Sequence, residues 1–580
     1  MRTFAPKIQE ICQMRYFFIL LSSLFFWGVF SGGHTFASLP YEGILLETPS
    51  PKHEVRAVWL ATIGGIDWPR SSSASRQKEE LRQMLDKLCQ AGVNTVLFQA
   101  RVRATTVYPS AMEPWDVCIN GGQKRGSTGT SPGYDPLRLC IELCHERGME
   151  CHAWVVTLPV GKWNSGGCRM LRQKYPRLIK HIGEEGYMDP EQPQTGEYLS
   201  QICREIVRGY DVDGIHLDYI RYPEKWKMKV TRPKGREHIT AIVRRIHDAV
   251  KGEKPWVKMS CSPIGKHDDL SRYRSGGWNA RTAVCQDAQE WLRLGLMDQL
   301  YPMMYFKDNN FYPFAIDWQE NASGRTVAGG LGTYFLDPRE GRWTLDDVER
   351  EMNVLRQIGM GFCHFRAKFL CDNVKGVYDF TRRFCATPAL IPPMKQSGPV
   401  APEPPTDLQL KGHTLTWKAS SPQGGGSKAS PSRGRLEGVL YNIYASEDYP
   451  VDISRAENLI ATRLTKSSVN VPTGKMNFAV TAMNRYGQES AAAQLLLNAG
   501  PAYTAPAIAV THGQPVRIPR NPTLDADYII IENMLGSAVA IRPYGSIVSI
   551  KDIPPGMYQL RSLGRKGRNH RIGFFRIVST

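Results

Sequence analysis

The sequence lacks the patterns that identify several common classes of protein. Its 13 cysteines include no CxxC pair and no Cys/His spacing typical of a zinc site, and none lies after Cys385. No zinc-finger, helix-turn-helix or aromatic-basic strand signature accompanies the net charge of +18, which suits an anionic polymer or reflects a generally basic proteome. We therefore expect no cofactor, no metal and no nucleic-acid partner.

Long apolar runs are also scarce. One run, YFFILLSSLFFWGVF at residues 16–30, follows Arg2, Lys7 and Arg15 and precedes the small Ala37. This pattern predicts a cleaved export signal at residues 1–37, and hence a protein of the periplasm, the cell envelope or the exterior. An uncleaved anchor is the alternative, although the run is short for a spanning helix. No other stretch is apolar enough to cross a bilayer, so we expect no stable membrane span after cleavage.

Three of the cysteines lie close together in the sequence. Cys140, Cys144 and Cys151 surround a passage from a predicted helix to a predicted strand. We interpret them as small apolar packing residues rather than as a disulfide scaffold.

Residues 38–385 alternate short β-rich apolar runs with helical patterns, which is typical of βα units and a parallel sheet. Helical stretches such as KEELRQMLDKLCQAG and TLDDVEREMNVLRQIG end in a glycine suited to the left-handed turn after a helix. Eight strands are predicted, at residues 54–63, 95–102, 150–157, 212–220, 257–264, 298–306, 326–335 and 359–367. This number favours an α/β fold of the (β/α)₈ TIM-barrel type. A doubly wound open sheet is the alternative, but no Gly-rich dinucleotide or phosphate loop follows any strand.

The remainder of the chain has a different character. Residues 386–405 are Pro-rich and predict a semi-rigid linker that shares few contacts with the barrel. Residues 406–498 alternate apolar and polar positions and resemble a fibronectin type III sandwich. Residues 503–580 are again β-rich. The barrel is thus expected to precede two small all-β modules.

The stretch VDGIHLDYIRYP at residues 212–223 places a carboxylate where an apolar strand ends. Asp218 falls at the C-terminal end of the fourth strand, on the same side as His216, and active sites of such barrels lie at that end. A salt bridge with Arg221 that ties down a loop is the alternative. Other expected strands carry polar or aromatic residues that would gather at the same rim to bind a sugar substrate, namely Gln99, Arg101, His152, Trp154 and Tyr305.

Glycoside cleavage, the chemistry that such a rim suggests, requires one protonated and one ionised carboxyl group. We assign Asp218 as the ionised group, because Arg101 or Arg221 would lower its pKa. Asp287, in the loop after the fifth strand, is the leading partner, followed by Glu224 and by Asp268 or Asp269. Each of these could equally be a surface carboxylate.

The chain also resembles the glycoside hydrolase-like 10 family of bacterial envelope and secreted proteins. The matching stretches include EVRAVWLAT, GVNTVLFQAR, VYPSAMEPW, PGYDPLRLCIELCHERGMECHAW, VDGIHLDYIRYP and AQEWLRLGLMDQLYPMMYF. The resemblance implies a TIM barrel that hydrolyses peptidoglycan glycan strands already stripped of their peptides. It implies site positions at the barrel rim, which in this sequence are Gln99, Arg101, His152, Trp154, Asp218, Tyr219 and residues 298–305.

Two departures from the family pattern leave two classes of function open. Thr105 stands where many members have an acidic residue, and Tyr219 follows Asp218 where many members have a second aspartate. The first class is an exported glycoside hydrolase that acts on a polysaccharide of the envelope. The second is a carbohydrate-binding or scaffold protein whose barrel has lost one catalytic carboxylate.

Overall fold

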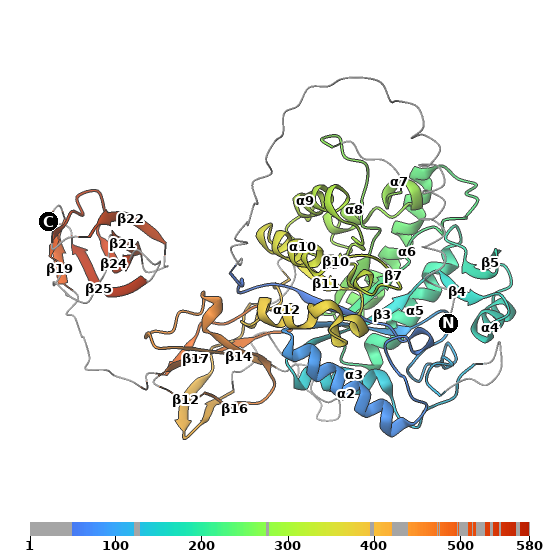
Figure 1. Ribbon diagram of the computed structural model, residues 1–580, viewed down its shortest axis with the longest axis horizontal. Coiled ribbons are helices and arrows are strands. Elements are labelled where there is room, and N and C mark those ends of the chain that lie inside the picture. The colour runs from blue at the N-terminus through green and yellow to red at the C-terminus, as the bar shows by residue number, and fades with distance from the viewer. Residues whose placement is uncertain are drawn as a thin grey trace, which may run out of the picture. The chain divides into compact units, whose positions relative to one another are not determined.

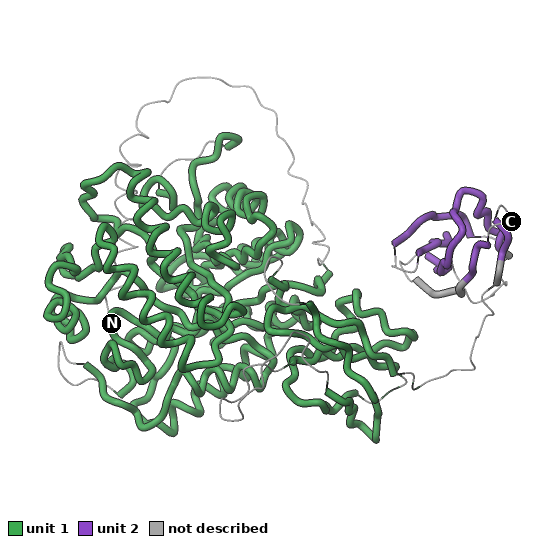
Figure 2. Tube along the Cα trace, turned by 180° about the vertical axis from the view of Figure 1, so that it is seen from behind, with its two compact units in different colours: residues 1–497 green, residues 498–580 purple. Residues whose placement is uncertain are grey.

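The computed structural model describes residues 49–120, 128–273, 278–394, 400–419 and 439–497 without 473, 475 and 496, and parts of 508–578. The predicted export signal at residues 1–37 lies outside the described residues. In the part of the chain that is described, no helix is long and apolar enough to cross a membrane. The chain divides into two compact units, residues 1–497 and 498–580 (Figure 2).

Eight parallel strands close into a barrel, with the order β1-β11-β10-β9-β8-β7-β3-β2, and helices cover its outside (Figure 1). The strands are β1 (Arg56–Leu60), β2 (Thr95–Arg101), β3 (Glu150–Val156), β7 (Gly214–Asp218), β8 (Lys258–Ser262), β9 (Gln299–Leu300), β10 (Thr326–Leu331) and β11 (Gly361–His364). All eight lie within predicted strands, and the (β/α)₈ architecture is confirmed. Every strand residue except Thr326 and Asp218 is buried, which explains the continuous apolar runs of the sequence.

The helices around the barrel follow from local signals in the sequence. The longer ones are α2 (Ala74–Gln90), α3 (Pro136–Glu146), α5 (Pro193–Gly209), α6 (Arg232–Glu253), α9 (Tyr312–Glu320), α10 (Leu345–Gln357) and α12 (Val377–Phe384). Helix α10 begins with a capping box in which Thr344 and Asp347 satisfy each other's backbone N–H groups. It ends before Gly359, whose φ of +77° suits glycine.

A small three-stranded sheet between β3 and α5 was not predicted. It consists of β4 (Pro159–Lys162), β6 (Glu185–Met188) and β5 (Ile179–Ile182), with helix α4 (Gly166–Lys174) between β4 and β5 (Figure 1). Strands of four residues with mixed polarity give little periodic signal in a sequence. The sheet leaves the barrel at the C-terminal end of β3, so it adjoins the predicted rim.

The prediction that residues 386–405 share few contacts with the barrel is wrong for residues 386–394. Leu390 is 2% exposed and exchanges backbone hydrogen bonds with residues at the N-terminal side of β1. The fully buried guanidinium of Arg56 donates to the carbonyl of Thr387 at 2.7 Å, and Asn94 donates to that of Ala389 at 3.1 Å. This stretch is therefore part of the barrel, because its backbone satisfies buried polar groups of the barrel.

The described residues between 406 and 497 form two sheets around a shared core. One contains β12 (Thr406–Lys411), β13 (Thr414–Lys418) and β16 (Ser468–Asn470), and the other contains β15 (Leu459–Leu464), β14 (Leu440–Ser446), β17 (Asn477–Met483) and β18 (Ala493–Leu495). Trp417 of the first sheet packs on Tyr441 of the second, with ring centroids 5.3 Å apart. We call this part the β-module.

Buried ion pairs join the β-module to the N-terminal end of the barrel. Arg463 donates to Glu150 at 2.9 Å and to Asp213 at 2.7 Å, and all three side chains are at most 8% exposed. Arg485 binds Asp211 at 2.9 Å. Such pairs hold only in one geometry, so the β-module is fixed to the barrel.

The second unit contains a five-stranded sheet and a two-stranded one. The first has the order β19 (Ile508–Thr511), β25 (Asn569–Val578), β24 (Gly556–Leu563), β21 (Tyr528–Asn533), β22 (Ala538–Pro543), and the second pairs β20 (Val516–Arg517) with β23 (Ile547–Val548). Their buried core includes Ile529, Ile531 and Phe575. The predicted β-rich character of this part is confirmed.

Candidate active site

Asp218 is the last residue of β7 and is partly exposed at the C-terminal end of the barrel. Its carboxylate accepts three hydrogen bonds, from the Ser262 hydroxyl at 2.9 Å, the Tyr219 backbone N–H at 2.8 Å and the Trp154 indole N–H at 3.2 Å. These donors come from the adjacent strands β8 and β3 and from the residue that follows Asp218. The predicted position of Asp218 at the barrel mouth is confirmed, and its orientation is fixed from three sides.

Tyr219, the residue after Asp218, has a strained backbone and contacts two further predicted site residues. Its φ of +57° is a left-handed conformation that is costly for a bulky residue, about 1–3 kcal/mol, and such strain is concentrated at functional sites. Its ring lies under the Arg221 guanidinium, 3.8 Å from the centroid, and its hydroxyl donates to Glu224. Arg221 binds the other oxygen of Glu224 at 2.8 Å. The predicted residues Asp218, Tyr219, Arg221 and Glu224 therefore form one connected group.

Aromatic side chains surround Asp218 on the barrel side. Tyr305 packs against Phe365, Tyr334 and Trp59, with ring centroids 5.2, 5.7 and 6.4 Å apart. The Tyr305 hydroxyl is buried and has no hydrogen-bond partner among the described residues, and Asp218 contributes to raising the pKa of Tyr305, after burial and the nearer Tyr334 and Cys363. Aromatic faces of this kind stack on sugar rings. Tyr305 and Trp154 are thus brought to Asp218, as predicted.

The electrostatic prediction for Asp218 is wrong in sign. Burial raises the pKa of this carboxyl above the ordinary aspartate value, and the hydrogen bonds from Ser262, Trp154 and Tyr219 and the charge of Arg221 only partly oppose this effect. Arg101 does not take part. Desolvation outweighs one nearby cation because the carboxylate lies among aromatic side chains.

The raised pKa of Asp218 leads to a testable pH dependence. If Asp218 acts as the ionised group, kcat/KM should fall toward acid at a higher pH than an ordinary aspartate would give. Ser262→Ala removes a donor that stabilises the ionised form, so this acid limb should move further up, by up to about one pH unit. Ser260→Ala is the matched control, because the Ser260 hydroxyl binds His216 and not Asp218. A pH profile that is unchanged in Ser262→Ala, or one that falls only toward alkali, would contradict the assignment.

Arg101 ends β2 at the C-terminal side of the barrel, but its side chain is not available to a substrate there, contrary to prediction. It is fully buried, binds both carboxylate oxygens of Glu113 at 2.7 and 2.8 Å, and donates to the backbone carbonyls of Val156 and Thr157. Tyr198 donates to the same carboxylate. The guanidinium is thus engaged in holding the loop of residues 102–116 to the barrel and is not placed to bind a substrate carboxylate.

Gln99, His152 and His216 also differ from the prediction. His152 lies near the N-terminal end of β3, where it binds Glu150, and His216 is fully buried between Trp59 and Ser260. Burial holds the pKa of His216 well below its ordinary value, so the ring is neutral. The Gln99 side-chain oxygen accepts the backbone N–H groups of Thr62 and Ile63. These residues face inward as periodicity indicates, but they fill the barrel or hold its loops.

The carboxylates considered as partners of Asp218 have other contacts. Asp287 lies among His267, Arg236 and Arg281 at 3.4–3.5 Å. Burial favours its protonated form, yet the hydrogen bond from His267 and the charges of the two arginines hold its pKa below the ordinary value. Asp268 binds Arg281 at 2.8 Å. Arg221 and Tyr219 likewise hold the pKa of Glu224 below its usual range in spite of burial. The lowered pKa values of Asp287 and Glu224 favour their ionised forms, which does not suit a general acid.

Sequence reasoning missed two residues of this region. Ser262 ends β8 as Asp218 ends β7, so the same rule of looking at strand C-termini would have found it. Glu113 stands in the quoted stretch VYPSAMEPW, but nothing in the sequence indicates that it pairs with Arg101.

The geometry agrees with comparisons of the chain with known proteins. The sequence model of the glycosyl hydrolase-like 10 family matches residues 54–328. Glycosyl hydrolase YngK of Bacillus subtilis is 27% identical over 498 residues, covering 76% of this chain and 92% of YngK. Glycosyl hydrolase DigH of Escherichia coli is 29% identical over 300 residues, covering 45% of this chain and 67% of DigH.

Among solved structures, the glycoside hydrolase domain of PgaB (BpsB) from Bordetella bronchiseptica aligns with a TM-score of 0.41 and 14% identity, over 57% of this chain and 98% of that domain. The match to YngK is longer than the whole chain up to the end of the barrel, so it includes part of the β-module. The similarity to YngK therefore extends past the barrel of this chain.

Proposed function

We propose that the barrel is a glycoside hydrolase in which Asp218 is the ionised catalytic carboxylate. The observation that carries this proposal is the position of Asp218, which is oriented by three donors at the C-terminal end of β7 beside a group of aromatic side chains. An ionised carboxylate at this place can act as nucleophile or as base toward a glycosidic bond. The names of the relatives support the same reaction class.

The substrate in this proposal is a glycan of the bacterial envelope, namely peptidoglycan strands without peptides. The predicted export signal, the net charge of +18 and the resemblance to the glycoside hydrolase-like 10 family support it. The predicted export signal also supports a location outside the cytoplasm. The two-sheet arrangement of the β-module supports its assignment as fibronectin type III-like.

The substrate proposal is tested with two polymers of equal length. We expect purified full-length protein to cleave peptide-free peptidoglycan strands faster than chitin oligomers, measured by chromatography of the products over time. Because Arg101 is bound to Glu113, recognition of a substrate carboxylate would have to come from other cations. Equal rates on both polymers would contradict the peptidoglycan assignment and leave the glycosidase proposal standing. Cleavage of neither would favour the second candidate.

The second candidate is a carbohydrate-binding protein without hydrolytic activity. The tight pairing of Glu224 and Asp287 with cations favours it, because neither is protonated and free to serve as the acid. Glycan binding without product formation would distinguish this candidate from the first.

A further inference from the structure

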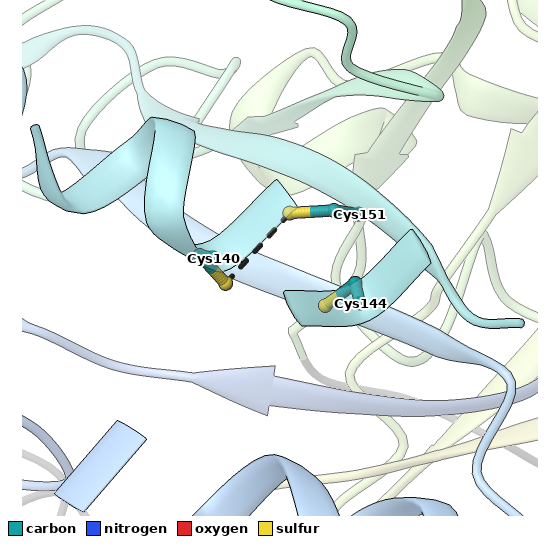
Figure 3. Close-up of side chains that lie close together, drawn as sticks. All are labelled: Cys140, Cys144 and Cys151. Carbon is teal, nitrogen blue, oxygen red and sulfur yellow. Dashed lines mark hydrogen bonds between the residues drawn. The ribbon is translucent and has the colours of Figure 1, made fainter. Parts of the chain in front are cut away.

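The side chains of three cysteines, Cys140, Cys144 and Cys151, meet between helix α3 and strand β3, away from Asp218. Cys140 and Cys144 are one helical turn apart on the buried face of α3, and Cys151 lies on strand β3 with its sulfur toward theirs (Figure 3). All three are free thiols with no solvent exposure. The Cys140 and Cys151 sulfurs are 3.9 Å apart, and the three sulfurs lie within 4.8 Å of one another.

This geometry is close to that of a metal–thiolate centre. With metal–sulfur bonds of about 2.3 Å, sulfurs around one ion are about 3.8–4.0 Å apart in tetrahedral or trigonal coordination. One pair already has this separation, and rotation about Cα–Cβ bonds would bring the third sulfur in. The i, i+4 spacing of Cys140 and Cys144 places both side chains on one face of α3.

The backbone of the cysteine group is held by a neighbouring set of charged side chains. The Cys151 backbone N–H donates to Asp213 at 2.9 Å, and this carboxylate also binds His145, the residue after Cys144, at 2.8 Å. Asp213 in turn belongs to a group of ion pairs in which Lys258, Arg463 and Arg485 bind Glu150, Asp211 and Asp213.

Apolar packing, the role expected from the sequence, explains isolated buried cysteines but not their convergence. Cys203 and Cys261 are equally buried in the same barrel. Among the described residues, however, Cys140, Cys144 and Cys151 are the one group of three or more His, Cys, Asp or Glu side chains that could hold an ion. This contrast separates a candidate ligand set from ordinary core cysteines.

We propose that Cys140, Cys144 and Cys151 bind one thiophilic metal ion, and that this set of three sulfurs favours monovalent copper over zinc. Soft thiolates select Cu⁺ and Zn²⁺ among the common ions, whereas structural zinc sites almost always have four ligands. Binding releases thiol protons, so it weakens as the pH falls. The ion would join α3 to β3 next to the ion pairs that hold the β-module. The proposal does not depend on the glycosidase activity.

The test uses full-length protein produced in medium with added copper and zinc and purified without chelators. We expect about one copper ion per chain by elemental analysis, and X-ray absorption at the copper edge with sulfur neighbours alone. The double variant Cys140→Ala/Cys151→Ala should lose this copper, whereas the control Cys203→Ala should keep it. The absorption spectrum requires only the wild-type protein, so the proposal stays testable if the double variant does not fold.

Three results would overturn the proposal. They are wild-type protein without bound metal, copper that the double variant retains, and nitrogen or oxygen neighbours in the absorption spectrum. About one zinc ion per chain, lost in the double variant, would support a thiophilic site but overturn the preference for copper.

Discussion

Asp218→Asn is expected to lower glycan hydrolysis by about 10³-fold or more, equivalent to at least about 4 kcal/mol of transition-state stabilisation. The asparagine has nearly the same shape but carries no charge, so it can act neither as nucleophile nor as base. The loss should appear in kcat rather than in KM, because the sugar contacts of the aromatic side chains remain. Steady-state rates on a soluble glycan with a reducing-end label measure it.

The structure also indicates what this variant does to stability. Asp218 accepts hydrogen bonds on both oxygens, so the new amide group must direct its N–H₂ at the Trp154 indole N–H or at the Ser262 side. This mismatch should cost about 1–3 kcal/mol of unfolding free energy, which thermal unfolding will report.

Asp268→Asn is the matched control for Asp218→Asn, since Asp268 follows the neighbouring strand β8 but binds Arg281 instead of facing the aromatic group. It should retain wild-type turnover. Wild-type turnover in Asp218→Asn would exclude Asp218 as a catalytic group.

Truncation after Cys385 is expected to unfold the barrel, whereas truncation after Leu497 should leave it folded. The shorter protein loses the buried Leu390 and the acceptors of Arg56 and Asn94. It also leaves Glu150 and Asp213 without Arg463, and removal of one partner of a buried ion pair costs about 3–5 kcal/mol. With about 2 kcal/mol for each large apolar side chain exposed, the loss approaches the whole stability of an ordinary domain.

Circular dichroism during heating and the soluble yield distinguish the two truncated proteins. Arg463→Ala in the full chain removes the buried ion pairs but leaves the rest of the β-module in place. We expect it to lower the unfolding free energy by about 3 kcal/mol, the lower end of the range, because Lys258 still pairs with Glu150. Arg455→Ala, in which an exposed arginine loses only Glu457, is its control and should change little. A soluble, cooperatively unfolding barrel that ends at Cys385 would show that the β-module is only an appendage.

The strands and the main helices of the barrel could be read from the sequence because their signals are local. A buried parallel strand needs a continuous apolar run, and α10 needs its capping box and terminal glycine, whatever surrounds them. For the same reason Asp218 could be placed at the C-terminal end of its strand from the alternation of VDGIHLDY alone.

The sequence by itself thus determined the eight-stranded barrel, the β-rich C-terminal parts and the carboxylate at the barrel mouth. Only the tertiary structure decided which polar side chains are available there, because availability depends on partners far away in the chain. The Arg101 side chain is paired with Glu113. Glu150 is paired with Arg463, which follows it by 313 residues in the sequence. The direction of the pKa shift of Asp218 is likewise decided by burial in the assembled barrel, which outweighs the opposing charge of Arg221 in its own motif. Burial and pairing are properties of the assembled core, and no local pattern encodes them.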